Sequence, residues 1–569
     1  MSILPLTKLK TVFLSEFIIV FTMAMGVASQ EFSYLVLLLL IISFLKLNKL
    51  DALKLFIISI PLFVALPPNQ FSDSMSIWRF LIFALVAKVG WEIYKNEGDI
   101  LGCRLRFYKF PTISTRKLFF LTILFFIIAL LSLISAQDIG VGIKKILFLS
   151  NILLLFPIVI LTIKTESDFR QVIKFIFYST GLLVAIGYFQ FILTFFIPLF
   201  TFWQFWAQNI IVAFYGQNLS DLLSYSNTWF SYYNILPPTL RMFSVMPDSH
   251  SFAMLIVISI PALLTLIFYK LKSKFYIFAL IIFFLAIFFS GSRGIWVGSI
   301  FALLAGVYLF INSQNAEFKN HFCKLNLRAC FFSCPCFKLL IEKIKIEKII
   351  NQIKFLKNSN DYSNAHFSKL LIYSLLLFFI LMPVSSFMLR GNQEAQLIRS
   401  NIQLSDEEKE ELNIFERAIS ISDFSEISNK GRLQIWSETL MSVKNNLFLG
   451  VGFGNFPLIL EENITNSKKG ASAHNIYLDI LSEIGIIGLV IFLLILIEIL
   501  KTSYNLFFKL KTRYLKIFTG SFFIYFTWIC AYGFFDVVIF NDKVLIMVVV
   551  MTGVLYSLKR SKGFSPKEN

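Results

Sequence analysis

The segment HNIYLDILSEIGIIGLVIFLLILIEIL, residues 474–500, decides the fold class. It is mostly apolar and longer than the roughly 20 residues that a helix needs to cross the ~30 Å hydrocarbon core of a membrane. The same criterion of length and hydrophobicity identifies about fourteen such segments in the whole chain. They lie near 11–29, 31–45, 52–66, 76–94, 118–136, 145–163, 170–197, 250–269, 275–290, 294–312, 370–389, 474–500, 517–537 and 543–558. The sequence therefore predicts an all-α fold, a polytopic transmembrane helix bundle of about 14 spans.

The composition excludes an ordinary soluble protein. Of the 569 residues, 57% are hydrophobic and 15% are charged, with a mean hydropathy of +0.74. Soluble domains carry about 25% charged residues, so this chain has too little polar surface for several water-soluble domains. The net charge of +18 could indicate nucleic-acid binding. In a membrane protein, basic cytoplasmic loops are the commoner cause, and we expect no nucleic-acid partner.

The distribution of Lys and Arg sets the expected orientation. Segment 313–369 has ten basic and four acidic residues, whereas segment 390–472 has nine basic and twelve acidic residues. If the spans alternate, the former is cytoplasmic and the latter faces outward, and both termini are cytoplasmic. Further basic loops fall on the cytoplasmic side, at 46–54, 95–117, 270–274 and 501–516. The protein is therefore expected to be a multi-pass membrane protein with both termini in the cytoplasm.

Membrane and loop segments alternate along the predicted chain. They are N-terminal spans (1–197), a first outer loop (198–248), spans around a Ser-Gly-Ser-Arg-Gly turn (249–312), a basic cytoplasmic insert (313–369), one span (370–389), a large helical outer loop (390–473), and C-terminal spans with a cytoplasmic tail (474–569). The insert holds Cys323, Cys330, Cys334 and Cys336, whose spacing matches no standard zinc site. Residues 337–356 after it have the pattern of a helix lying on the inner leaflet.

Two arginines stand out at the outer ends of spans. Arg293 lies in the turn Ser290 to Gly294, which is too short for anything but a tight reversal between spans. Its guanidinium suits a bidentate contact with phosphate, although an arginine there can also simply anchor the hairpin at the membrane edge. Arg241 is the only basic residue between 198 and 248. The aromatic residues of that loop are expected to form an interfacial belt.

The large outer loop supplies a third arginine. Ser405 to Glu408 has the pattern of a capping box that starts an acidic helix, and Arg432 opens a second helix. That helix ends in the glycine-rich run 450–455. Because this run follows a helix and has the wrong spacing, it is interpreted as a compact turn and not as a dinucleotide-binding motif.

His474 lies where the large outer loop re-enters the membrane. Imidazole is the side chain best suited to take a proton near neutral pH, although a lone histidine at the start of a span is often structural. Asn475 follows it, and Glu483 lies about 13 Å deeper along the helix, where we expect it to meet a polar partner. His250 and Asp248 begin another span, and Asp248 is expected to cap that helix.

Arginines and a histidine that face outward beside lipid could grip a diphosphate and activate a hydroxyl. The outer segments contain no acidic metal motif, so neither a metal nor a cofactor is expected. These residues therefore suggest glycosyl transfer from a lipid-diphosphate donor.

At these positions the chain resembles the O-antigen ligase and polymerase superfamily of bacterial envelope proteins. The resemblance covers roughly 240–500 and rests on the ordered set of the turn at 290–294, Gly431-Arg432 with Trp436, the glycine-rich run 449–455, and His474-Asn475 followed by Glu483, Gly485 and Gly488. It implies a metal-independent, inverting glycosyltransferase. If the matching positions have the same roles as in that superfamily, Arg293 and Arg241 would hold the diphosphate and Arg432 would position the donor. His474 would deprotonate the acceptor hydroxyl. His250, Asn475 and Glu483 would support the site.

Three functions remain open at this stage. A polymerase would join repeat units carried on polyprenyl diphosphate, and a ligase would move glycan onto a lipid or protein acceptor; extra spans slightly favour the polymerase. A transporter of lipid-linked sugars would have midplane charges or repeats, and the chain offers only Glu16 and Asp536 as charged residues of no evident role. Expected partners are the lipid-linked glycan donor, a glycan or lipid acceptor, membrane lipids, and chain-length or flippase proteins.

Overall fold

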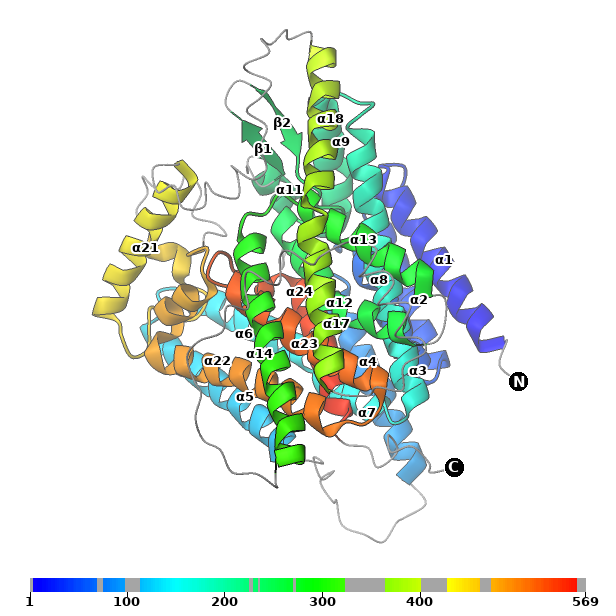
Figure 1. Cartoon of the computed structure of the whole chain (residues 1–569). Helices are drawn as coiled ribbons and strands as arrows, with labels where there is room; N and C mark the ends of the chain where they lie inside the picture. The colour runs from blue at the N-terminus through cyan, green and yellow to red at the C-terminus, as the bar shows by residue number, and fades with distance from the viewer. Residues whose placement is uncertain are drawn as a thin grey trace.

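The computed structural model describes residues 4–68, 75–97, 113–224, 229–233, 236–269, 273–322, 364–400, 427–460 and 472–559. These residues form a helical bundle, which confirms the predicted all-α class (Figure 1). The described residues include a helix at each of the predicted spans, while the exact number of membrane crossings stays a prediction. The expected acidic helix beginning at 405–408 and the cysteine-bearing insert with its helix at 337–356 lie outside the described residues.

The helices follow the chain in three groups. The N-terminal group is α1 (Leu4–Ala24), α2 (Phe32–Lys46), α3 (Lys49–Ser59), η1 (Ile60–Leu62), α4 (Trp78–Glu97), α5 (Ile113–Ser132), η2 (Leu133–Ser135), α6 (Ile139–Leu153), α7 (Leu155–Thr162) and α8 (Glu166–Leu193). The central group is α12 (Ser249–Phe268), α13 (Ser273–Phe289), α14 (Gly294–Phe322), α17 (Asn364–Ile380), α18 (Met382–Ser400) and α21 (Ile427–Asn445). The C-terminal group is η5 (Phe456–Leu458), α22 (Ile476–Lys509), α23 (Arg513–Tyr532), η6 (Val538–Phe540) and α24 (Asp542–Ser557).

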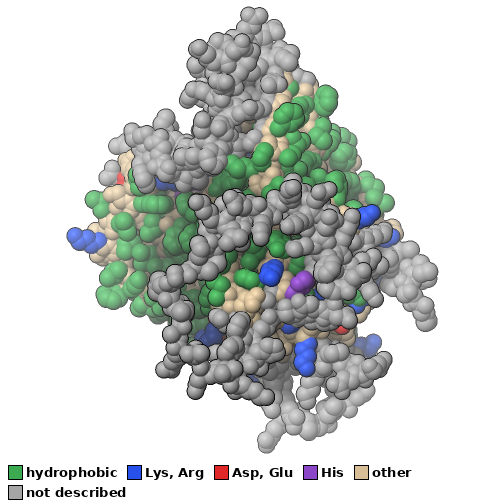
Figure 2. All heavy atoms as spheres, in the orientation of Figure 1, with side chains coloured by type: hydrophobic (Ala, Val, Ile, Leu, Met, Phe, Trp, Pro, Cys, Tyr) green, Lys and Arg blue, Asp and Glu red, His purple; other side chains and the backbone are tan. Residues whose placement is uncertain are grey.

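Eight helices within the described ranges are long and apolar enough to cross a membrane. They are Thr115–Ser135, Ile139–Thr162, Glu166–Leu193, Ser249–Phe268, Gly294–Gln314, His366–Leu389, Ile476–Lys509 and Arg513–Tyr532. Large hydrophobic side chains such as Phe120, Leu147 and Tyr308 are exposed on the bundle, and Figure 2 shows such side chains over wide areas of one face. In water this surface would be costly, whereas in lipid it is favourable. The chain is therefore a multi-pass membrane protein.

Helix α12 lies at the centre of the bundle. It packs against α8, α13, α23 and α24, and nearly all of its side chains are buried. Its first turn is fixed by the carboxylate of Asp248, which accepts hydrogen bonds from the backbone N and the Oγ of Ser251, both at 2.7 Å. The predicted cap at Asp248 is thus confirmed, and it sets the position of His250 two residues later.

Helix α22 is broken at Gly485, which has φ +69° and ψ −174°. A loop approaches the helix closely at this glycine: a Cβ at Gly485 would lie 2.1 Å from the carbonyl oxygen of Phe448. The break frees the backbone of α22 to bond this loop, with Val451 and Gly452 donating to the carbonyls of Ser482 and Glu483. The run 450–455 is the predicted compact turn, and Gly450, Gly452 and Gly454 all have positive φ.

The described part of the first outer loop is built from short elements, and two of its aromatic residues differ from expectation. It contains short helices, α9 (Leu199–Phe205), a π-helical turn η3 (Trp206–Ile211), α10 (Val212–Tyr215) and α11 (Gln217–Ser224), followed by the antiparallel strands β1 (Phe230–Tyr233) and β2 (Leu236–Leu240), with Phe230 opposite Leu240. The expected interfacial belt is wrong for Trp206 and Trp229, which are buried. Their indole nitrogens donate to the carbonyls of Ser244 and Pro247, so they hold the segment that follows Arg241.

Candidate active site

Two turns far apart in the sequence meet at the candidate site. The backbone N of Met242, beside Arg241, donates to the carbonyl of Phe289 at the end of α13. The turn that follows contains Gly291 with φ +61°, and a Cβ there would approach the Cγ of Arg241 at 3.2 Å and the Oγ of Ser231 at 3.3 Å. Glycine is needed for this backbone conformation. The turn at 290–294 is therefore the predicted tight reversal, and it lies directly against Arg241.

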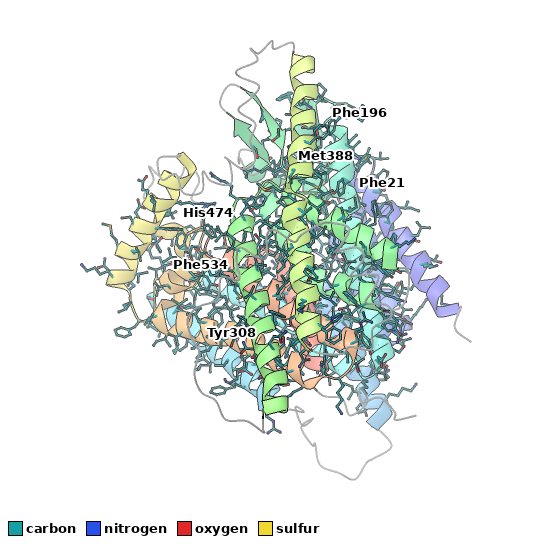
Figure 3. All side chains as sticks on the ribbon, viewed as in Figure 1. Phe21, Phe196, Tyr308, Met388, His474 and Phe534 are labelled. Atoms are coloured by element: carbon teal, nitrogen blue, oxygen red, sulfur yellow. The ribbon has the colours of Figure 1, made fainter. Side chains whose placement is uncertain are left out.

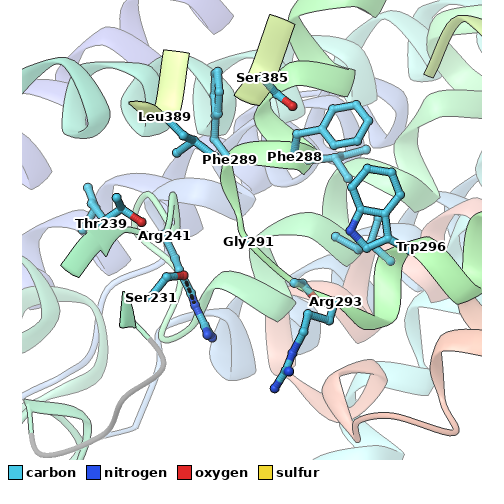
Figure 4. A pocket seen from close by; sticks show the side chains of 14 residues that line it. Ser231, Thr239, Arg241, Phe288, Phe289, Gly291, Arg293, Trp296, Ser385 and Leu389 are labelled. Carbon is cyan, nitrogen blue, oxygen red and sulfur yellow. Dashed lines mark hydrogen bonds between the residues drawn. The ribbon is translucent and has the colours of Figure 1, made fainter. Parts of the chain in front are cut away.

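Arg241 and Arg293 line one pocket together with Gly291 and Ser292. The Nε of Arg241 donates to the Oγ of Ser231 at 3.0 Å. Figure 4 shows both guanidinium groups extending in the same direction from the two sides of Gly291. Two guanidinium groups placed in this way can bind a divalent oxyanion from two sides.

The hydroxyl of Ser292 connects this pocket to a histidine. It lies 2.8 Å from the Nδ1 of His250 and 2.7 Å from the hydroxyl of Tyr532 on α23. The Tyr532 hydroxyl also lies 2.7 Å from the same Nδ1. His250, Ser292 and Tyr532 thus form a closed hydrogen-bonding triangle that fixes the ring of His250.

Asp536 lies between two imidazoles in the segment that follows α23. Its carboxylate is 3.9 Å from the Nε2 of His250 and 3.8 Å from the Nδ1 of His474. These distances are those of charge contacts and not of hydrogen bonds. Burial alone would raise the pKa of Asp536, but His474 and His250 hold that pKa below its usual range.

The backbone at His474 is strained. Its φ of +47° is in the left-handed region, which is uncommon for a residue other than glycine. Asn475 fixes the next residues as the cap of α22, because its side-chain oxygen accepts from the backbone N of Tyr477 and Leu478. The side chain of His474 is 45% exposed, and Figure 3 labels it beside α21. His474 is therefore held rigidly while its ring remains accessible.

Helix α21 brings Arg432 to the same place. The indole nitrogen of Trp436 donates to the carbonyl of Ala473 at 2.8 Å, which ties α21 to the start of α22. Arg432 lies one turn before Trp436 on the same helix face. The face of α21 that carries Arg432 is thereby held beside the start of α22, where His474 lies.

Glu483 lies apart from this cluster and forms an ion pair that the sequence did not identify. Its carboxylate is 2.5 Å from the Nζ of Lys145 on α6, and the ammonium lies over the ring of Phe453, 4.6 Å from its centroid. The expectation of a buried polar partner is confirmed. Asp479, one turn before Glu483, accepts from the backbone N of Ala473 at 2.6 Å, which links this helix to the residue before His474.

The structure thus brings together Arg241, Arg293, Arg432, His250 and His474. Glu483 pairs with Lys145 away from this cluster, and Asn475 caps α22. Sequence reasoning missed Tyr532 and Lys145. It noted Asp536 only as a charged residue without a role, although an unpaired charge near a span is a signal for a functional site. Among the described residues, no three His, Cys, Asp or Glu side chains come together as metal ligands; the metal-free expectation stays a prediction.

Comparison with protein families gives one finding. Residues 349–493 match the model of the family described as O-antigen ligase. The matched region includes α21 and the first half of α22, and with them Arg432, His474, Asn475 and Glu483. The match supports the resemblance to the O-antigen ligase-like superfamily and indicates a ligase- or polymerase-type membrane function in glycan biosynthesis. Comparison with curated proteins gives no match.

Proposed function

Because residues 349–493 match the O-antigen ligase family, we propose that this membrane protein transfers glycan from a polyprenyl-diphosphate carrier at the outer face of the bacterial cytoplasmic membrane. We propose further that it polymerises repeat units. The observation that carries the proposal is the hydroxyl of Ser292, which lines the pocket of Arg241 and Arg293 and contacts His250. Anion-binding groups and imidazoles are thereby held next to each other.

In the proposed reaction, the guanidinium groups of Arg241 and Arg293 bind the diphosphate of the donor. Arg432 approaches from α21 and helps to position the donor. As the bond between the anomeric carbon and the diphosphate oxygen breaks, the leaving group takes the electron pair. The fixed positive charges stabilise the negative charge that develops on it. No metal ion is needed for this step.

The acceptor hydroxyl attacks the anomeric carbon from the opposite face, so the configuration is inverted. The proton of this hydroxyl passes to the imidazole of His474, whose side chain is exposed. The imidazolium that forms is stabilised by the carboxylate of Asp536 at 3.8 Å. His250 is held by Ser292 and Tyr532, so we assign it a supporting role beside Asp536.

A ligase is the second candidate, and the match to a family of O-antigen ligases favours it. A ligase and a polymerase would share the donor chemistry and differ in the acceptor. In a ligase the acceptor is a lipid or protein, and in a polymerase it is another lipid-linked glycan. Chain-length or flippase proteins would be further partners of either enzyme.

The test uses the purified protein and a lipid-linked repeat unit, with and without a separate lipid acceptor. We expect a ladder of longer glycans without added acceptor. A single transfer that requires the separate acceptor would replace the polymerase by the ligase. If neither product forms while the donor is bound and the protein is folded, the proposed transfer is wrong.

A further inference from the structure

A second pocket opens beside the candidate active site. It lies between the first turns of α4 and α24, against α10 and α11, and its volume is about 490 Å³. The pocket of Arg241 and Arg293 holds only about 30 Å³. Ligand sites in proteins have roughly 300–1,000 Å³, so this second pocket is large enough for an organic ligand. Its lining includes Arg79, Phe148, Tyr215, Phe540, Asn541 and Asp542.

Several polar atoms around this pocket are buried without a partner. Ser76, Arg79 and Tyr215 line it. The Oγ of Ser76, the Nε of Arg79 and the hydroxyl of Tyr215 are buried beside the pocket and have no hydrogen-bond partner among the described residues. Lys543 is fully buried, and its Nζ also lacks such a partner. The Nζ lies 4.9 Å from the ring centroid of Tyr215 and 4.5 Å from that of Phe214, a further lining residue. Buried polar groups are normally hydrogen-bonded, so the unpaired atoms of the lining residues Ser76, Arg79 and Tyr215 point to a ligand that supplies their partners.

The remaining lining residues indicate the class of ligand. Asp542 is held rigidly, because one carboxylate oxygen accepts from the indole nitrogen of Trp78 at 2.9 Å and the other from the backbone N of Lys543 at 2.7 Å. Phe148, Tyr215 and Phe540 are only partly buried and offer ring surfaces. Hydroxyl groups both donate and accept hydrogen bonds. A sugar ring has such hydroxyls at its rim and apolar C–H faces that pack on aromatic rings.

The pocket is adjacent to the candidate site along two segments. Pro247, which precedes Asp248 and His250, lines it. On the other side, η6 leads from Asp536 directly to Asn541 and Asp542. A chain of sugars could therefore reach from the imidazoles into this pocket.

We propose that this pocket, the glycan pocket, binds one sugar unit of the substrate glycan through Arg79, Tyr215 and Asp542. The inference rests on the proposed function, because that function supplies the glycan. Tyr215 and Arg79 contact the bound sugar and not the reacting atoms, so they determine affinity and not the chemical step.

The experiment measures binding without turnover. The purified full chain in lipid nanodiscs is titrated by calorimetry with oligosaccharide repeat units that carry no lipid or diphosphate. These repeat units are released from the surface polysaccharide of the cell in which the protein naturally occurs. In Tyr215→Phe we expect the affinity to fall about three- to tenfold, the loss typical of one hydrogen bond. The thermal stability of the ligand-free protein should be equal or higher, because an unpaired buried hydroxyl is removed.

Two further variants make the test specific. Tyr525→Phe removes a hydroxyl from another buried tyrosine, on α23 and outside the pocket lining, and should leave the affinity unchanged. Arg79→Gln should weaken binding more than Tyr215→Phe, because it removes a charged donor. Equal affinity of wild type, Tyr215→Phe and Arg79→Gln would overturn the inference, as would equal losses in Tyr525→Phe and Tyr215→Phe.

A parallel transfer assay on the wild type separates this inference from the proposed function. If the wild type forms glycan products but the affinity for the oligosaccharide is the same without Tyr215 or Arg79, the proposed glycan pocket is wrong and the proposed transferase function stands. Binding that depends on both residues, in a folded protein that forms no glycan product, would support the glycan pocket and overturn the transferase.

Discussion

At the scale of single residues, Asp536 organises the candidate site because its carboxylate faces both His250 and His474. One buried carboxylate thus lies between two rings whose residues are 474 − 250 = 224 positions apart in the sequence. On the other side of His250, Ser292 and Arg293 are neighbours in the turn between α13 and α14. The side chains of Asp536 and Ser292 therefore set the geometry around His250, and the arginines add positive charge to the site.

Arg293→Lys should lower the transfer rate about 10- to 1000-fold, because an ammonium group cannot reproduce the two-pronged contact of a guanidinium with a diphosphate. The measurement is the rate of glycan transfer from purified lipid-linked donor. The thermal stability of the variant serves as control and should be unchanged. Wild-type activity in Arg293→Lys would show that Arg293 only anchors the hairpin.

Asp248→Asn should stabilise the protein, and more so at pH 8 than at pH 4.5. Burial and the negative charge of Asp536 raise the pKa of Asp248 to about 6. The native state therefore binds this proton more tightly than the unfolded chain does, and the cost of ionising Asp248 grows between pH 4 and pH 6 and stays constant above. Asparagine keeps the helix cap and removes that cost.

The expected difference between the two pH values is on the order of 1 kcal/mol, measurable by thermal unfolding in detergent. Equal shifts at both pH values, or a loss of stability at pH 8, would contradict the charge repulsion between Asp248 and Asp536.

At the scale of elements, the break in α22 joins the large outer loop to the membrane bundle. The backbone of Leu447, Val451 and Gly452 bonds to α22 on both sides of Gly485. Lys145 of α6 closes the arrangement through its ion pair with Glu483. The loop 447–452, α22 and α6 are therefore fixed to one another, close to the strained backbone at His474.

Gly485→Ala should destabilise the protein and lower activity together, because its Cβ would lie 2.1 Å from the carbonyl oxygen of Phe448 and its φ is +69°. We expect a loss of about 1–3 kcal/mol, as for other strained backbone positions, measured by thermal unfolding. Gly181→Ala in α8 is the matched control, because nothing lies within 4 Å of its Cβ position; it should be neutral or stabilising. Equal stability of both variants would show that the break tolerates a side chain.

The sequence was sufficient for the helices but not for their irregularities. Runs of apolar residues placed α12, α13, α14 and α22 correctly because hydrophobicity over about 20 residues is a local property. Gly485 could equally have been a packing glycine in a straight helix, since only the approach of residues 447–449 distinguishes the two. The hairpin of β1 and β2 was missed because its few residues carry no alternating pattern long enough to detect.

Within the candidate site, single residues could be predicted from the sequence, but their contacts with one another could not. His474, Arg293 and Arg241 were proposed because charged residues at the ends of spans are costly and therefore informative. Lys145 and Glu483 are 338 positions apart, and no local pattern connects them. Tyr532 looked like any aromatic residue of a span, and only its contact with Ser292 and His250 identifies it.

At the scale of the whole molecule, the predicted topology places the ends of α12, α13, α14, α22 and α23 that carry the site on the outer side. The cytoplasmic side is predicted from basic loops, and the site residues come from loops and turns on the opposite side. This separation suits a donor whose lipid stays in the membrane while its glycan faces outward.

Chelation tests the expected independence from metals. With EDTA in the transfer assay, activity should stay within about twofold of the untreated protein, because fixed guanidinium groups stabilise the leaving group. The control is a divalent cation added back after chelation, which should change nothing. Loss of activity with EDTA and its recovery with a divalent metal would require a different account of the leaving group.

The most direct test of the whole account is single-turnover transfer by His474→Ala with the lipid-linked donor at saturating concentration and donor binding measured on the same sample. The account predicts that His474→Ala binds the donor as wild type does and transfers glycan at least about 100-fold more slowly, the usual loss on removing a general base. Transfer at the wild-type rate would contradict it.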